Sequence, residues 1–181
     1  VKSHIPGLAQ MAEGIGDPQV RHRGTLGGST AHADPAADYP AGLIGLNATI
    51  KTNQRSIAAE DFFQGMFTTA LEPEELITSV RFAKPQKSAY AKFANPASKY
   101  AIVGVFVAQF ADHVRVAVTG AAPSYMRIDA MEKALSSQFS ADAIDQIEVS
   151  ADGMSDDPDA NAAYRAHLIT VMAKRAVKAA A

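Results

Sequence analysis

Apolar residues recur at helical spacing near both ends of the chain. Between residues 5 and 15 they fall at Ile5, Leu8, Met11, Ala12 and Ile15. Spacings of three and four residues place these side chains on one face of a helix. Residues 159–178 carry a longer pattern of the same kind, with lysine and arginine toward its end, where the helix dipole favours cations. We therefore predict helices over 5–15 and 159–178.

The middle of the chain contains shorter apolar runs that are typical of strands. Residues 101–110 are apolar at almost every position, which predicts a central strand covered on both faces. The pair Asp112-His113 separates this run from residues 114–119, so the two runs are expected to form a hairpin. Other strands are predicted over 48–51, 55–57, 76–82 and 90–93, and short helices or helical turns over 40–46, 60–65, 127–136 and 140–147, with Ser140 capping the last.

The order of these elements indicates the α+β class. A mixed first part is followed by a layer of antiparallel strands, which the last helices cover. The segment 83–88 is polar and contains a proline, as expected of a boundary between domains. We therefore predict a first domain over 1–83 and a small C-terminal domain over 84–181.

Composition limits the chemistry that these residues can carry. The 181 residues include no cysteine, which rules out disulfides, thiolate zinc sites and cysteine-bound iron–sulfur clusters within this chain. The formal net charge of −2 gives no general attraction to nucleic acid or anionic membranes. No apolar run approaches the roughly 18 residues of a membrane span and no signal peptide is visible, so we predict a cytoplasmic protein. Because the sequence begins at Val1, we expect a fragment or a processed product.

The densest polar chemistry lies in residues 20–38, VRHRGTLGGSTAHADPAAD. Gly27 and Gly28 belong neither to a GxGxxG fingerprint nor to a Walker A loop, since no lysine follows them. Adjacent glycines permit positive φ, so their amides could converge on an anion, with the hydroxyls of Thr25 and Ser29 beside them. The alternative is an ordinary turn between strands. The chemistry alone leaves both interpretations open.

Charged side chains surround these glycines. In a strand, Arg21 and Arg23 would share one face, where they could neutralise a pyrophosphate or form surface ion pairs. Asp34 precedes a proline and can cap a helix, whereas Asp38 can complement a helix dipole or accept hydrogen bonds from sugar or ribityl hydroxyls. His32 is a polar contact or a structural residue. No convincing nucleophile–base pair and no HExxH spacing are present, which favours a binding site for a phosphorylated, polyhydroxylated ligand over a hydrolytic centre.

Several segments together resemble one protein family. VRHRGTLGGSTAHADPAADYPAGLIGL resembles the second FAD-binding motif of the flavoprotein (medium) subunit in the molybdenum hydroxylase family. That family includes aerobic carbon monoxide dehydrogenase and xanthine dehydrogenase. The likeness continues through residues 59–65, 69–77, 90–100 and 164–168, in the family's order and over nearly the whole chain.

The resemblance implies roles for particular residues. Glycine-rich backbone would hold the FAD pyrophosphate without a Rossmann helix, and Asp38 would contact the flavin. Ile77 would lie beside the flavin, and Lys92 would place a cation near the isoalloxazine, where it stabilises negative charge on the reduced ring. Without the resemblance, Ile77 is a core residue and Lys92 a solvated lysine on an edge strand. The implied cofactor-binding residues are Thr25, Leu26, Gly27, Gly28, Ser29, His32, Asp34, Asp38, Ile77 and Lys92, with no catalytic or metal-binding residue.

One feature of the family is missing from this sequence. Family members carry an earlier glycine-rich motif of the AGGxxLLP type in an N-terminal subdomain, and these residues contain no such segment. Half of the pyrophosphate cradle would then be absent. Because each lost hydrogen bond costs about 1 kcal/mol, we expect this chain to bind FAD weakly or not at all.

The resemblance implies electron transfer as the function. Substrate would be oxidised at a molybdenum cofactor in a large subunit, electrons would cross 2Fe–2S clusters in a small subunit, and FAD would pass them to an acceptor. The lack of cysteine fits this division, because the clusters must lie in a partner. The alternative is a truncated, non-catalytic module that mainly docks partner subunits. A third interpretation, a phosphate-sugar-binding enzyme, lacks a nucleophile–base pair.

Overall fold

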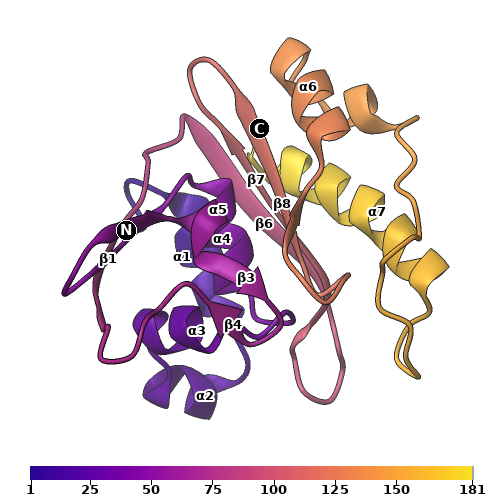
Figure 1. Cartoon of the computed structure of the whole chain (residues 1–181). Helices are drawn as coiled ribbons and strands as arrows, with labels where there is room; N and C mark the ends of the chain where they lie inside the picture. The colour runs from indigo at the N-terminus through magenta and orange to yellow at the C-terminus, as the bar shows by residue number, and fades with distance from the viewer. Residues whose placement is uncertain (181) are drawn as a thin grey trace.

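The protein is an α+β structure, as the sequence predicts, and it is built on a four-stranded antiparallel sheet (Figure 1). The computed structural model describes residues 1–180. The helices are α1 (Pro6–Glu13), α2 (Pro18–Arg23), α3 (Leu26–His32), α4 (Tyr39–Gly45), α5 (Ala59–Phe62), α6 (Asp129–Ser137) and α7 (Ala162–Ala180), with a 3-10 turn over Ala141–Ile144. The strands are β1 (Thr49–Thr52), β2 (Ser56–Ala58), β3 (Phe63–Gly65), β4 (Thr68–Thr69), β5 (Ile77–Arg81), β6 (Lys87–Ala94), β7 (Ala101–Gln109), β8 (Val114–Thr119) and β9 (Met126–Arg127).

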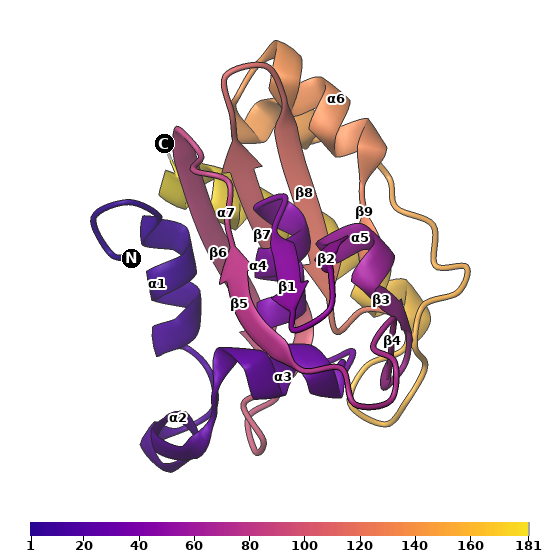
Figure 2. The ribbon, with the colours of Figure 1, turned by 60° about the vertical axis from the view of Figure 1, so that its left-hand side comes forward.

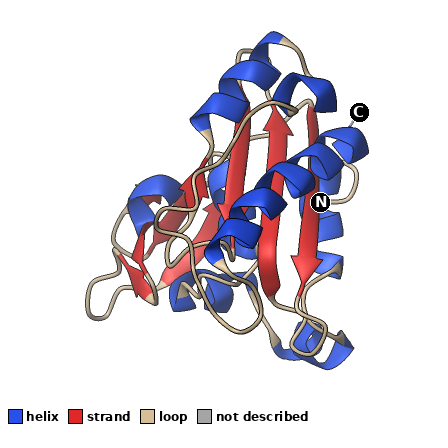
Figure 3. Ribbon diagram, turned by 90° about the vertical axis from the view of Figure 1, so that its right-hand side faces the viewer, coloured by secondary structure: helices blue, strands red, loops and turns tan. Residues whose placement is uncertain are grey.

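The main sheet has the strand order β6-β7-β8-β9. Helices α6 and α7 cover one face and α1 and α4 cover the other, so the sheet lies between two helical layers (Figures 1 and 3). β7 pairs with a strand on each side, and residues 101–108 of it are all buried. The prediction of a central strand covered on both faces is confirmed.

A hydrophobic core lies on each face of this sheet. Alternate residues of β7 point to opposite cores, since Phe106 packs with α1 and α4 whereas Val105 and Val107 pack with α7. The first core contains residues from both predicted domains, so the N-terminal helices use the C-terminal sheet as their packing surface. The domain boundary at residues 83 and 84 stays a prediction.

A smaller sheet with the order β2-β1-β5 and the β3–β4 ribbon lie beside α4 and α5 (Figure 2). An ion-pair network ties this region to the main sheet. Oε1 of Glu60, at the start of α5, accepts hydrogen bonds from Arg115 of β8 at 2.6 Å and from Arg127 of β9 at 2.7 Å. Segments far apart in the sequence are thereby held together.

Three predicted helical segments differ from those observed. The helical turn predicted over 60–65 ends at Phe62, and residues 63–65 form strand β3. The segment predicted as a helix over 140–147 is only a 3-10 turn, and Ser140 makes no capping hydrogen bond. Beyond the turn the chain runs along α7, where the Thr170 hydroxyl donates to the Ile147 carbonyl at 3.3 Å. The last helix begins at residue 162, because Asp157 Oδ1 accepts the amides of residues 159 and 160 and holds them in a turn. Within residues 1–180, no helix is both long and apolar enough to cross a membrane.

The carboxylate of Glu75 organises the loop before β5. Its side chain is fully buried and accepts hydrogen bonds from the Thr52 hydroxyl at 2.7 Å and from Nε and Nη2 of Arg55, both at 3.0 Å. These bonds, first of all those from Arg55, lower the pKa of Glu75 from 4.5 to about 2. Because the pKa is lower in the folded state, this carboxylate stabilises the fold above pH 4.5, and the contribution is lost as the pH falls from there toward 2.

Replacing Glu75 with glutamine should therefore make the unfolding temperature depend less on pH in the acidic range. We expect E75Q to unfold at a lower temperature than the unmodified protein at pH 7, with the difference shrinking as the pH falls from 5 toward 3. Thermal unfolding followed by circular dichroism across this pH range measures the difference. Glu148 is exposed, so E148Q is the control. A constant difference between E75Q and the unmodified protein at every pH would contradict the assignment.

Candidate functional site

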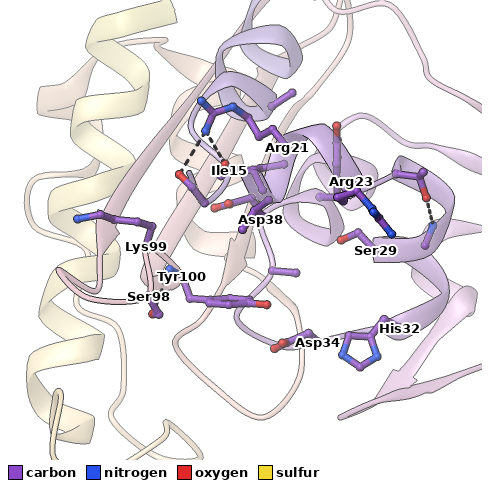
Figure 4. Close-up of a pocket in the computed structure, with 18 residues that line it drawn as sticks. Ile15, Arg21, Arg23, Ser29, His32, Asp34, Asp38, Ser98, Lys99 and Tyr100 are labelled. Atoms are coloured by element: carbon purple, nitrogen blue, oxygen red, sulfur yellow. Dashed lines mark hydrogen bonds between the residues drawn. The ribbon is translucent and has the colours of Figure 1, made fainter. Parts of the chain in front are cut away.

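A cavity of about 640 Å³ opens where the polar stretch 20–38 meets the loop between β6 and β7 (Figure 4). Its walls come from the end of α1, from α2, α3 and the turn before α4, and from residues 98–100. This volume lies within the range of small-molecule and cofactor sites, about 300–1,000 Å³. Six predicted site residues line the cavity: Thr25, Gly28, Ser29, His32, Asp34 and Asp38.

The paired glycines lie in a helix, not in an anion-binding turn with positive φ. Both belong to α3, and neither is among the positive-φ glycines of residues 1–180. Thr25 begins the helix, since its hydroxyl accepts the Gly28 amide at 2.9 Å. A Cβ on Gly28 would lie only 2.8 Å from that hydroxyl oxygen, so glycine leaves room for the cap. Neither glycine therefore has the positive φ of a nest, and neither lies in a turn between strands, so both geometries are wrong, whereas binding of an anion by this backbone stays a prediction.

The two arginines lie in helix α2, so the expectation that they share a strand face is wrong. Asp17 caps this helix by accepting the Val20 amide at 2.9 Å, with Pro18 following it. Nη1 of Arg21 donates to the carbonyls of Ile15 at 2.8 Å and Gly16 at 3.2 Å, which fixes the loop between α1 and α2.

Arg23 is the cation of this pair that remains available to a ligand. Its side chain is exposed, lines the cavity, and makes no hydrogen bond or ion pair within residues 1–180. Figure 4 shows it with Ser29 on the α2–α3 side of the cavity. An exposed, unpaired guanidinium suits a phosphate, because it presents several donors in a planar fork.

Asp34 holds a turn, not a helix cap. Its Oδ1 accepts the Ala36 amide at 2.9 Å, and its carbonyl accepts the Ala37 amide at 3.0 Å. The helix expected over 40–46 begins at residue 39. His32 lies beside Phe67, with ring centroids 5.1 Å apart, and reaches the cavity from the end of α3.

Asp38 is the buried acid of the cavity wall. Its side chain is 4% exposed, and burial is the largest effect on it, raising its pKa despite the opposing effects of Lys92 and Tyr90. The Tyr90 hydroxyl donates to Oδ1, and Lys92 Nζ donates to Oδ2 at 2.9 Å. Each carboxylate oxygen keeps a second acceptor position, so Asp38 can still accept a hydrogen bond from a ligand.

Four predicted residues do not line the cavity. Lys92 lies behind Asp38, and its ammonium also donates to the carbonyls of Gly14 at 2.8 Å and Lys99 at 3.0 Å. Its three protons are thus used within the protein, so the alternative of a solvated lysine is wrong, whereas a place beside the isoalloxazine stays a prediction. Ile77 stands opposite Thr52 in the small sheet and packs on the first core. Leu26 and Gly27 lie in the first turn of α3, and Leu26 packs against the same core.

The opposite wall of the cavity was not predicted from the sequence. Ser98, Lys99 and Tyr100 line it from the β6–β7 loop, and Tyr39 lines it from the first turn of α4. The dipeptide Asn95-Pro96 is a turn signal that could have located the loop, because Asn95 Oδ1 accepts the amides of residues 97 and 98. No local signal places this loop beside the stretch 20–38.

The groups around the cavity fit a phosphorylated ligand of cofactor size. Hydroxyls of Thr25 and Ser29 and the guanidinium of Arg23 are donors suited to phosphate and sugar oxygens. Tyr39 and Tyr100 add aromatic surface of the kind that packs against planar rings. The donor set therefore supports a site for a nucleotide-like cofactor.

Comparison with known proteins identifies the family. A family model described as the FAD binding domain in molybdopterin dehydrogenase matches residues 1–85, and one described as the CO dehydrogenase flavoprotein C-terminal domain matches residues 88–180. The chain belongs to the family of FAD-binding medium subunits of molybdenum hydroxylases, which are oxidoreductase subunits of the carbon monoxide dehydrogenase type.

Individual relatives support this membership. The chain is 33% identical to the nicotine 6-hydroxylase medium subunit of Paenarthrobacter nicotinovorans, over 98% of this chain and 68% of that subunit. It is 32% identical to the carbon monoxide dehydrogenase medium chain of Hydrogenophaga pseudoflava, over 99% of this chain and 68% of that one. Among solved structures, reconstituted CO dehydrogenase from Oligotropha carboxidovorans matches with a TM-score of 0.85 and 28% identity, over 99% of this chain and 68% of that chain. The chain thus spans about two thirds of these relatives.

Proposed function

We propose that the cavity holds part of an FAD and that the chain serves as the electron-transferring flavin subunit of a molybdenum-containing hydroxylase. A molybdenum-cofactor large subunit and a 2Fe–2S small subunit are the proposed partners. The observation that carries the proposal is the convergence of Thr25, Ser29, Arg23 and Asp38 on one cavity, within the segment that matches the FAD binding domain. When bound, FAD supplies the chemistry of accepting and passing on electrons.

Each wall of the cavity has a proposed task in binding. Arg23 and the hydroxyls of Thr25 and Ser29 hold phosphate and ribityl oxygens. Asp38 accepts a hydrogen bond from the ligand through a free lone pair, and Tyr39 and Tyr100 offer aromatic surface to a ring. None of these groups has to act as a nucleophile or a general base, since the cofactor itself carries the electron-transfer chemistry.

Affinity should be low for a protein made only of these residues. They contain no AGGxxLLP-type segment, so the hydrogen bonds that such a segment would add are missing. At about 1 kcal/mol for each bond, a loss of several bonds weakens binding by orders of magnitude. We expect a dissociation constant for FAD above about 10 μM.

Replacing Arg23 with glutamine should weaken the binding of FAD and leave the binding of riboflavin unchanged. The guanidinium is assigned to phosphate, which riboflavin lacks, so we expect R23Q to bind FAD about tenfold more weakly while riboflavin is unchanged. Quenching of flavin fluorescence measures both constants. R175Q is the matched control, because Arg175 is an exposed arginine of α7 outside the cavity.

The same titration separates the competing functions. If R23Q weakens the binding of FAD and of riboflavin equally, the assignment of Arg23 to the phosphate is wrong. No quenching of any flavin by the unmodified chain at millimolar concentrations would contradict the flavin assignment and favour a module that only docks partner subunits.

A further inference from the structure

Two neighbouring side chains of β6 converge on the buried acid of the cavity. Tyr90 and Lys92 are two residues apart, so they point to the same face of the strand. The Tyr90 hydroxyl donates to one oxygen of Asp38, and Lys92 Nζ donates to the other. Both oxygens are therefore held from the sheet side, which leaves the carboxylate one orientation in the cavity wall.

A glycine in the adjacent strand makes room for this arrangement. Gly104 of β7 is paired with Lys92, on the face that Tyr90 occupies. A Cβ on Gly104 would collide with the Tyr90 hydroxyl. The Tyr90 ring packs beside Phe106, at 6.3 Å between centroids, so both ends of the tyrosine are confined. Glycine inside a central strand fits a place where another group approaches closely.

The ammonium of Lys92 joins three segments of the site. Besides Asp38 before α4, it binds the carbonyl of Gly14 after α1 and the carbonyl of Lys99 in the β6–β7 loop. Lys99 and Tyr100 of that loop line the cavity on the side opposite to α3. Lys99 has a φ of 64°, a left-handed conformation that needs support from its surroundings.

We propose that Tyr90 and Lys92 are positioning residues, which together fix the carboxylate of Asp38 and hold the loop 95–100 against it. They act through Asp38 and the loop, and Lys92 does so without lining the cavity. Any change in flavin affinity caused by these residues rests on the proposed function. The hydrogen bonds by which Tyr90 and Lys92 fix Asp38 and the loop, here called the clamp, are a property of the chain by itself.

The first experiment tests the clamp without flavin. Tyr90→Phe removes only the hydroxyl, whose hydrogen bond lowers the pKa of Asp38. We expect carbon-13 NMR of the Asp38 carboxyl to show a higher pKa in Y90F than in the unmodified chain. Tyr164 lies on the α7 side of the main sheet, packed edge-on against Phe93, so Y164F is the control and should leave that pKa unchanged.

Lys92→Met tests the hold on the loop. We expect hydrogen exchange of the amides of residues 97–101 to become at least about tenfold faster, while exchange in β8 stays as in the unmodified chain. If K92M does not fold, Y90F alone decides through the Asp38 pKa. An unchanged Asp38 pKa in Y90F overturns the positioning role of Tyr90, and unchanged loop exchange in a folded K92M overturns that of Lys92.

The second experiment adds flavin and separates this inference from the proposed function. We expect Y90F to bind FAD about fivefold more weakly than the unmodified chain, since the ligand must now order the carboxylate. FAD binding that is equal in Y90F and the unmodified chain would overturn the link to the site. If the unmodified chain quenches no flavin, the proposed function fails while the NMR and exchange results still decide the clamp.

Discussion

Replacing Asp38 with alanine is expected to destabilise the fold and to weaken FAD binding by more than about tenfold. The substitution leaves the ammonium of Lys92 buried without its anion and the Tyr90 hydroxyl without its acceptor. Breaking a buried ion pair from one side costs roughly 3–5 kcal/mol, because the remaining charge is uncompensated. Urea unfolding measures the stability, and flavin quenching measures the affinity.

Two comparisons make this result specific. Asp38→Asn keeps the shape and an acceptor for Tyr90 but loses the charge, so we expect it to fall between the unmodified protein and D38A. Asp61→Ala removes an exposed acid and should change neither quantity. Unfolding of D38A and D61A at the same urea concentration would show that Asp38 carries no buried interaction.

The largest purely structural effect is expected for Arg165→Met in α7. Arg165 is 4% exposed, and its guanidinium donates to the carbonyls of Ile102 at 2.8 Å and Gly120 at 2.9 Å. It also pairs with Asp157 at 2.6 Å. Methionine would fill the space but leave these acceptors unpaired, at a cost of roughly 3–5 kcal/mol.

This loss should be visible in denaturant unfolding as a lower midpoint with an unchanged slope. Arg175→Met, an exposed position on the same helix, is the control and should unfold like the unmodified protein. A midpoint for R165M equal to that of R175M would mean that the carbonyls find other donors.

Periodicity predicted the main sheet because the pattern is local. Residues 101–110 are apolar on both faces of the strand, and such a run is typical of a strand whose sheet is covered on both faces. The conformation of the glycine pair could not be predicted in the same way. Gly27 and Gly28 suggested positive φ, but the Thr25 hydroxyl cap made them the first turn of a helix. Threonine before a helix is a recognisable signal, and the glycines obscured it.

The cavity depends on contacts that sequence spacing does not encode. Asp38 was a candidate from its chemistry, but its partners Tyr90 and Lys92 follow more than fifty positions later, and only the packing of α4 on the sheet brings them together. Tyr100 was missed for the same reason. Lys92 was a candidate only through a family resemblance; its place beside the flavin stays a prediction, and its hydrogen bonds inside the protein could not be predicted.

The proposed site for FAD is the cavity between α1–α4 and the loop 98–100. Titration of the nitrogen-15-labelled chain with FAD, followed by amide NMR, tests it most directly, because weak binding still shifts resonances. We predict shifts concentrated in residues 15–39 and 98–100, with riboflavin affecting fewer of them. If millimolar FAD leaves the resonances of these amides unchanged, or shifts only amide resonances elsewhere in the chain, FAD does not bind in this cavity.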